Sequence, residues 1–244
     1  MKPIAIFRHS PGEGPGYFAT FLDRHSLPWT LFRVDDGVPP PPTSDEFSGL
    51  CFMGGPMSVN DDLPWIPKTL ELIRQADAQG IPVIGHCLGG QLMAKAFGGT
   101  VTQNPVKEIG WGEVQASDDA AQLSIQLATQ LTTEWLGSTA RFEAFHWHGE
   151  TFTLPPGATR ILQSAHCTNQ AFVRGPHLGL QCHVEMTESM IRNWCQQWAA
   201  ENVPPSASVQ TPEQMQTGME ARIAAMRAVA DSLYSRWIKE LISP

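Results

Sequence analysis

The stretch Ile81-Pro82-Val83-Ile84-Gly85-His86-Cys87-Leu88-Gly89-Gly90-Gln91 decides the fold of this 244-residue chain. Its first four residues are an apolar run that predicts a short buried strand, and the residues from Gln91 to Phe97 predict a helix. Between them, glycines at i−2 and i+2 flank Cys87, the spacing of the sharp strand-to-helix turn called a nucleophile elbow. A helix N-terminus favours thiolate over thiol. The segment predicts an activated nucleophile; the alternative is an inert buried thiol.

A candidate base and a candidate orienting acid lie together in the segment Gly179-Leu180-Gln181-Cys182-His183-Val184-Glu185. His183 and Glu185 are two residues apart, so both side chains point to the same side of an extended segment. The carboxylate can then hold one imidazole nitrogen while the other nitrogen faces the thiol, as in a catalytic triad. An isolated His-x-Glu pair would more simply be a surface ion pair, but the cysteine elbow favours the triad.

A third segment, Leu50-Cys51-Phe52-Met53-Gly54-Gly55-Pro56, predicts an apolar strand that ends in a double-glycine turn. Acyl transfer to a thiolate needs backbone N–H groups that point at the developing oxyanion. Gly55 has no side chain to block its amide, and the amide of Leu88 directly follows the nucleophile. We therefore expect these two amides to form the oxyanion hole; the alternative for Gly54-Gly55-Pro56 is an ordinary turn.

Together the three segments resemble the class I (triad-type) glutamine amidotransferase family. The family pattern Gly-x-Cys-x-Gly-x-Gln is met between Gly85 and Gln91, and the pattern Gly-Gly-Pro between Gly54 and Pro56. The pattern His-Pro-Glu is met at 183–185, except that Val184 replaces proline. The three motifs follow the family order, and the chain looks related to the amidotransferase domain of GMP synthase.

The resemblance implies that Cys87 attacks a γ-glutamyl amide, that His183 acts as acid and base, and that Glu185 orients the histidine. A γ-glutamyl thioester would form and water would hydrolyse it. A supporting role near the active site is implied for His148-Gly149-Glu150. No metal and no cofactor is expected. The resemblance also implies three substrate contacts, at Gln91, Asn169 and Gln170.

Two enzyme functions and one other function remain open at this point. The chain is either a stand-alone hydrolase of glutamine or another γ-glutamyl compound, which we favour, or a glutaminase subunit that supplies ammonia to a separate synthase. The sequence shows no glycine-rich phosphate loop and no second domain that would consume ammonia. A non-catalytic, thiol-bearing binding or stress protein is the third function, and the pair His183 and Glu185 disfavours it.

Composition restricts the classes of binding partner and the cellular compartment that we expect for this chain. The net charge of −8 and the pI near 5.4 argue against nucleic acid and acidic membrane surfaces. No apolar stretch approaches membrane-spanning length, and Met1–Phe7 enters a strand instead of a signal peptide. Five cysteines without a Cys-x-x-Cys favour neither disulfides nor a zinc site, so a reducing cytoplasm is expected. His146-Trp147-His148 has metal-like spacing without a third ligand nearby, and packed strand histidines are the preferred interpretation.

The wider pattern predicts an α/β fold, an open and mostly parallel sheet flanked by helices, with a smaller antiparallel section. The resemblance implies the flavodoxin-like fold of class I glutamine amidotransferases. Apolar runs spaced for crossover helices are Ile4–Phe7, Trp29–Val34, Leu50–Met53 and Pro82–Gly85. Shorter runs, expected to be antiparallel, are Gly112–Gln115, Arg141–Trp147, Arg160–Ala165, Ala171–Arg174 and Leu178–Gln181. Glu108–Gly112 is expected to be a structural turn.

We expect a catalytic domain over residues 1–203 and a linker with a C-terminal amphipathic helix over 204–244. Thr211-Pro212-Glu213 predicts a helix start with proline in the first turn. An apolar stripe then recurs every three or four residues from Met215 to Leu241. This stripe either packs on the parent domain or mediates self-association or binding of a partner subunit.

Overall fold

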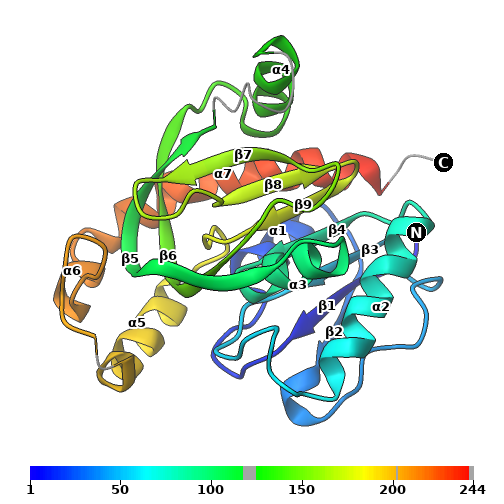
Figure 1. Ribbon diagram of the computed structural model, residues 1–244, viewed down its shortest axis with the longest axis horizontal. Helices are drawn as coiled ribbons and strands as arrows, with labels where there is room; N and C mark the ends of the chain where they lie inside the picture. Colours follow the sequence, from blue (N-terminus) through cyan, green and yellow to red (C-terminus); the bar gives the residue numbers. More distant parts are fainter. Residues whose placement is uncertain (118–124, 202, 242–244) are drawn as a thin grey trace.

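A computed structural model describes residues 1–117, 125–201 and 203–241 of the chain. Within these residues one sheet of nine strands runs in the order β2-β1-β3-β4-β9-β8-β7-β5-β6 (Figure 1). The strands are β1 (Ile4–Arg8), β2 (Trp29–Arg33), β3 (Gly49–Phe52), β4 (Val83–His86), β5 (Val101–Ala116), β6 (Arg141–Phe152), β7 (Thr159–Ser164), β8 (Ala171–Arg174) and β9 (His177–Leu180).

The sheet is parallel at one end and antiparallel at the other, as the sequence predicted. Strands β1 to β4 pair in parallel, whereas β5 to β8 pair antiparallel. Strand β9 belongs to both parts, because it runs parallel to β4 and antiparallel to β8. The expected antiparallel pairing of 178–181 is confirmed by β8, whereas its parallel pairing with β4 was not predicted. Because β9 pairs with β4, the segment that follows β9 lies close to the end of β4.

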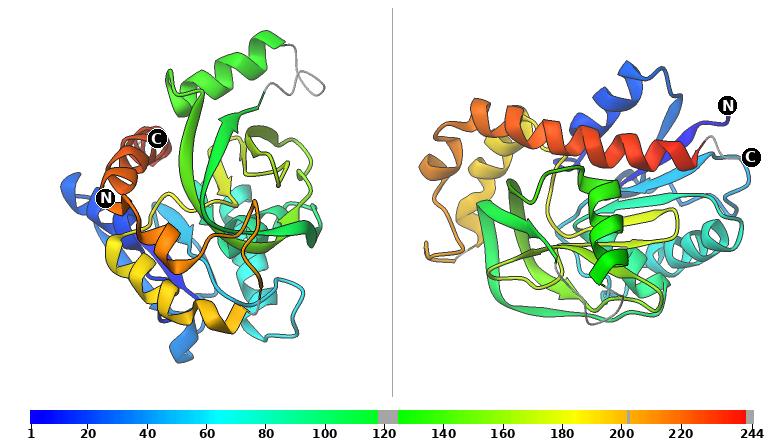
Figure 2. Two further views of the ribbon diagram at one scale, coloured as in Figure 1. Left: turned by 90° about the vertical axis from the view of Figure 1, so that its left-hand side faces the viewer. Right: turned by 90° about the horizontal axis from the view of Figure 1, so that it is seen from above.

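Helices cover both faces of the sheet (Figure 2). Side chains of β1 and β3 alternate between the faces, so that Ile6 packs with α1 and α7 while Phe7 packs with α2 and α3. The helices are α1 (Gly16–Arg24), α2 (Trp65–Ala78), α3 (Leu88–Ala96), α4 (Ile125–Leu136), α5 (Glu188–Gln197), α6 (Pro212–Gln216) and α7 (Met219–Glu240), with short 3₁₀ turns η1 (Val34–Asp36) and η2 (Trp198–Glu201). None of them, as far as the structure describes the chain, is long and apolar enough to cross a membrane.

The segment Glu108–Gly112 lies inside the long strand β5, not in a turn. The register between β5 and β6 shifts between Gln103 and Glu108, which marks a bulge in the ladder. Trp111 is buried and meets Phe145 edge-on at 5.2 Å between ring centroids, so the packed tryptophan was predicted correctly.

The C-terminal segment is integrated into the body of the protein. Its predicted start is confirmed by a capping box at Thr211, but the expected single helix is two, because Gly218 has a left-handed φ of 64° between α6 and α7. Before α6, Val209 forms a parallel bridge with Ile109 of β5. The apolar stripe of α7, including the fully buried Trp237, shares one core with α1. The stripe therefore packs on the parent domain, which was the first of its two expected roles.

Candidate active site

Cys87 lies on a strained turn between β4 and α3. Its backbone has φ 51° and ψ −108°, a left-handed conformation that costs a non-glycine residue on the order of 1–3 kcal/mol. The turn is tight because the glycines around it touch backbone. A Cβ on Gly85 would lie 2.4 Å from the carbonyl carbon of Gly89, and one on Gly89 would lie 2.0 Å from the carbonyl oxygen of Phe52. The geometry is that of a nucleophile elbow.

His183 and Glu185 follow β9, the strand beside β4, and this places them next to the elbow. The amide of Cys87 donates to the carbonyl of Leu180 at 2.8 Å, which ties the two segments together. His183 Nδ1 lies 2.6 Å from Glu185 Oε1, and both side chains are buried. The backbone N–H of Val184 donates to Glu185 Oε2 at 3.0 Å. Proline has no N–H, so this bond exists only because valine occupies the position.

The pair is charged at neutral pH. Burial by itself would raise the pKa of Glu185, but the neighbouring charges of His183 and His86 and its hydrogen bonds lower it to about 2. Burial would lower the pKa of His183, but Glu185 and the nearby Cys87 hold it well above its usual range. Among the described residues, no hydrogen bond of ordinary geometry occupies His183 Nε2. This nitrogen therefore carries a proton that it can donate.

Two further buried side chains, His86 and Tyr234, lie next to Glu185. His86 Nε2 lies 3.9 Å from Glu185 Oε2 and shares a hydrogen bond of 3.0 Å with the hydroxyl of Tyr234. Burial lowers the pKa of His86, so its imidazole is neutral at pH 7. Tyr234 comes from α7, which is thus linked through His86 to Glu185. Sequence analysis missed this link because nothing in the motif pattern joins residues so far apart.

A cavity of about 580 Å³ opens over Cys87. Gly55 and Gln91 line it, as does His148-Gly149-Glu150, in agreement with the expected position of that segment near the site. The side-chain amide of Gln91 donates to Gln181 Oε1 at 3.1 Å, and the amide of Gln181 lies 3.7 Å from the sulfur of Cys87. Gln181 stands two residues before His183, inside the motif, but was not singled out from the sequence.

The structure does not bring Asn169 and Gln170 to this cavity. Gln170 is fully buried and donates to Glu108 Oε2 at 2.7 Å. Asn169 accepts a hydrogen bond from Arg160 at 2.8 Å and donates to a carbonyl of β6. Neither is among the described residues that line the cavity, so the geometry does not support their expected contact with substrate.

Glu13 is a cavity residue that sequence analysis missed. It lies in the loop between β1 and α1, against Gly54, which His183 also approaches. A Cβ on Gly54 would lie 2.0 Å from Glu13 Oε2 and 3.2 Å from His183 Cε1. Burial raises the pKa of Glu13 to about 7, with the charge of Glu185 adding to the rise and that of His183 opposing it. A lone acidic residue in a glycine-rich loop gives no pattern from which its position could be inferred.

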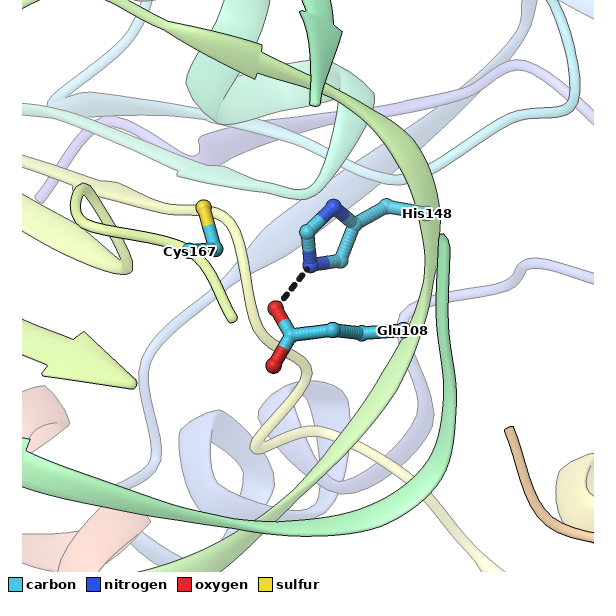
Figure 3. Close-up of side chains that lie close together, drawn as sticks. All are labelled: Glu108, His148 and Cys167. Carbon is cyan, nitrogen blue, oxygen red and sulfur yellow. Dashed lines mark hydrogen bonds and ion pairs between the residues drawn. The ribbon is translucent and has the colours of Figure 1, made fainter. Parts of the chain in front are cut away.

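The histidines of β6 belong to a buried polar cluster that the fold assembles. Figure 3 shows His148 beside Glu108 and Cys167, whose ligand-type atoms lie within 4.8 Å of one another. Glu108 accepts hydrogen bonds from Ser164, at 2.8 Å, and Gln170, at 2.7 Å. Burial would raise the pKa of Glu108, but the hydrogen bond with His148, the charges of His146 and His148 and the hydrogen bond from Ser164 lower it to about 2. His148 Nε2 lies 3.0 Å from Glu108, and its Nδ1 lies 3.0 Å from a backbone carbonyl of β6. Both ring nitrogens thus face acceptors, and the cluster is a hydrogen-bonded support for the strand that lines the cavity.

Comparison with known proteins agrees with this geometry. The family model for class I glutamine amidotransferases matches residues 26–194. The glutamine amidotransferase-like protein YfeJ of Salmonella typhimurium is 30% identical over 196 residues, 77% of each chain. A GMP synthase of Vibrio vulnificus is 26% identical over 76% of this chain but only 38% of the synthase, and γ-glutamyl peptidase 3 of Arabidopsis thaliana is 27% identical over 72% of this chain and 71% of the peptidase.

Among solved structures, a glutamine amidotransferase of Methylobacillus flagellatus superposes with a TM-score of 0.91 at 44% sequence identity, over 100% of this chain and 97% of that one. The matched residues include the cysteine elbow and the segment that carries the histidine and glutamate. The chain belongs to the class I glutamine amidotransferase family.

Proposed function

We propose that this protein hydrolyses a γ-glutamyl amide bond, with Cys87, His183 and Glu185 as its catalytic triad. The observation that carries the proposal is the short hydrogen bond of 2.6 Å between His183 and Glu185, next to a cysteine on a strained elbow at the floor of a cavity. Nucleophile, acid–base and orienter come from two neighbouring strands, the arrangement that thiolate chemistry on an acyl group requires.

The reaction would run in two steps through a thioester. The thiolate of Cys87 attacks the γ-carbonyl carbon, the carbon–nitrogen bond breaks, and His183 Nε2 gives its proton to the leaving nitrogen. His183, now neutral, takes a proton from water, which attacks the thioester carbon. The carbon–sulfur bond then breaks, glutamate leaves, and the thiolate–imidazolium pair of Cys87 and His183 is regenerated. Glu185 keeps the imidazole in place and stabilises its charged form in both steps.

We propose that the amides of Gly55 and Leu88 stabilise the oxyanion. Gly55 lines the cavity with Cys87 and lies next to the first residue of α3, since a Cβ on Gly55 would be 2.8 Å from Leu88 Cδ2. Two amides at the edge of the same cavity can approach one carbonyl oxygen from adjacent directions. Donors of this kind contribute on the order of 2.7–4 kcal/mol to the transition state in enzymes of related chemistry.

A stand-alone hydrolase is the function we favour for this chain. The similarity to γ-glutamyl peptidase 3 over most of both chains supports it, because that protein's name describes cleavage of a γ-glutamyl bond. The similarity to part of a GMP synthase supports the second candidate, a glutaminase that passes ammonia to a synthase. Both share the triad and the thioester and differ in what controls turnover.

The test measures glutamate release by the purified protein from glutamine and from a panel of γ-glutamyl dipeptides and amides. We expect turnover that is independent of any other protein and abolished in Cys87→Ser. His183→Ala should also be inactive, whereas Glu185→Gln should retain partial activity because it orients without reacting. Activity in Cys87→Ser would contradict the proposed nucleophile. Hydrolysis of glutamine alone, and only after cell extract is added, would identify a synthase-dependent glutaminase instead.

A further inference from the structure

The cavity over Cys87 has a marked excess of negative charge. The described residues that line it include four carboxylates and one ammonium: Glu13, Asp61, Glu150, Glu201 and Lys107. The ammonium of Lys107 lies 2.7 Å from Glu201, so this pair is internally compensated. Glu150 accepts hydrogen bonds only from neutral groups among the described residues. Three carboxylates therefore face the cavity without a cation from its described lining.

Glu13 differs from the other three because it lies at Gly54, next to His183. Its Oε2 and the Cε1 of His183 both lie against Gly54, and no hydrogen bond to the Glu13 side chain is found within the described part of the chain. A carboxylate held in such a place loses hydration without a partner in return, and its pKa is raised to about 7 for this reason. A ligand that brings a positive charge to the Glu13 carboxylate would compensate for its lost hydration.

The position of Glu13 also shows which part of a substrate would meet it. In the proposed reaction His183 Nε2 protonates the leaving nitrogen, so that nitrogen and its substituent must pass beside the imidazole. Cε1 is bonded to Nε2, and Glu13 Oε2 lies against the same glycine, Gly54, as this atom. The γ-carbonyl, by contrast, faces the amides at Gly55 and Leu88. Glu13 therefore lies on the leaving-group side of the scissile bond.

The walls beside this position suit a cation on a methylene chain. Trp147 and Trp194 both line the cavity, and their rings meet edge-on with centroids 5.5 Å apart. The indole nitrogen of Trp194 donates to the carbonyl of Gly12 at 3.0 Å, which holds this ring beside the Glu13 loop. Aromatic faces attract ammonium groups and pack against alkyl chains.

On the basis of the proposed γ-glutamyl hydrolysis, we propose that Glu13 selects substrates whose leaving group is a cationic amine, namely γ-glutamyl monoamides of a diamine or polyamine. Water cleaves the amide to give glutamate and the free diamine, whose new amino group takes the proton from His183. The ammonium at the far end of the leaving group pairs with Glu13. A γ-glutamyl amino acid instead brings a carboxylate to the same place and is repelled.

The test compares three substrates with the same γ-glutamyl group: γ-glutamylputrescine, its neutral analogue γ-glutamyl-n-pentylamide, and γ-glutamylglycine. We expect kcat/KM to be at least about tenfold higher for the cationic amide than for the neutral one, because a charged hydrogen bond in a half-buried site is worth this much. The peptide should be the poorest of the three. In Glu13→Gln the ratio of cationic to neutral amide should fall by about tenfold. Glu46→Gln, which removes an exposed carboxylate before β3, should leave the ratio unchanged.

The ratio should also depend on pH in the native protein. Raising the pH through about 7 ionises Glu13 and should increase the preference for the cationic amide. The charged groups that face Glu13 are His183 and Glu185, with Glu150 and the Lys107–Glu201 pair further out in the cavity. The two catalytic groups act on the scissile bond of both amides alike, so their titration cancels in the ratio. In Glu13→Gln the ratio should be flat across this range.

Binding of both amides to Cys87→Ser, measured by calorimetry, tests the same selectivity without turnover. A cationic amide that is bound and cleaved no better than its neutral analogue by the native protein would overturn the inference, and so would an unchanged ratio in Glu13→Gln. A protein that binds the cationic amide selectively but cleaves none of the three substrates would contradict the proposed hydrolysis alone. The two proposals can therefore fail separately.

Discussion

Glu13→Gln is expected to stabilise the folded protein at alkaline pH, because the native residue is a carboxylate held in an unfavourable place. Burial raises the pKa of Glu13 from 4.5 to about 7. A rise of this size corresponds to about 3 kcal/mol between the two protonation states, and partial exposure to the cavity reduces the effect to about 1–3 kcal/mol.

The sign follows from proton linkage. Below about pH 4.5 the carboxyl is protonated in both the folded and the unfolded chain, so it costs no stability. Between about 4.5 and 7 only the folded chain keeps the proton, and stability falls as the pH rises. A glutamine cannot ionise, so the advantage of the variant should be small at pH 5 and full at pH 8.

The assay is urea or thermal unfolding of both proteins at these two pH values. For a chain of this size each kcal/mol shifts the melting temperature by about 2–4 °C. Glu46→Gln serves as the control, because it removes an exposed carboxylate and should behave like the native protein at both pH values. A Glu13→Gln variant that is no more stable than the native protein at pH 8, or equally stabilised at pH 5 and pH 8, would refute this account of the residue.

The remaining predictions concern stability. Tyr234→Phe should lower the free energy of unfolding by about 1–3 kcal/mol, because it leaves the fully buried His86 Nε2 without its hydrogen bond; an unchanged midpoint in urea would contradict this. Gly89→Ala should prevent folding or lower the free energy of unfolding by more than about 3 kcal/mol, since its Cβ would lie 2.0 Å from a carbonyl oxygen of β3. Gly14→Ala, whose Cβ would have no atom within 4 Å, should unfold like the native protein when unfolding is followed by circular dichroism. Above about pH 4.5, Glu108→Gln should be less stable than the native protein by about 2–3 kcal/mol. The difference should shrink as the pH falls toward 2, because the depressed pKa of Glu108 stabilises the fold only while the carboxylate is ionised. A pH-independent difference would exclude this linkage.

The residues of the proposed triad could be singled out from the sequence because each belongs to a short contiguous motif. The elbow needs glycines at i−2 and i+2 from Cys87, and the backbone contacts of Gly85 and Gly89 show why no other residue fits there. The spacing of His183 and Glu185 is likewise a local property of an extended chain. The parallel strands before them were visible as apolar runs for the same reason.

Contacts between residues far apart in the sequence could not be predicted in this way. Asn169 and Gln170 were placed by resemblance alone, and the structure finds them tied to other side chains instead. The support of Glu185 by His86 and Tyr234 depends on how α7 crosses the sheet, which no local pattern encodes. Residues that interact only after packing leave no periodic trace in the chain.

The sequence by itself determined the α/β class, the cysteine elbow and the local pairing of His183 with Glu185, since turn geometry and side-chain alternation depend on neighbours along the chain. Only the tertiary structure decided that β9 lies beside β4, which brings His183 to Cys87, and that the loop before α1 carries Glu13 into the cavity. Burial and neighbouring charge then set the pKa of Glu13 near 7, whereas the same carboxyl in the unfolded chain would titrate near 4.5. Desolvation depends on where the folded chain buries a residue, so it cannot be inferred from the residue type alone.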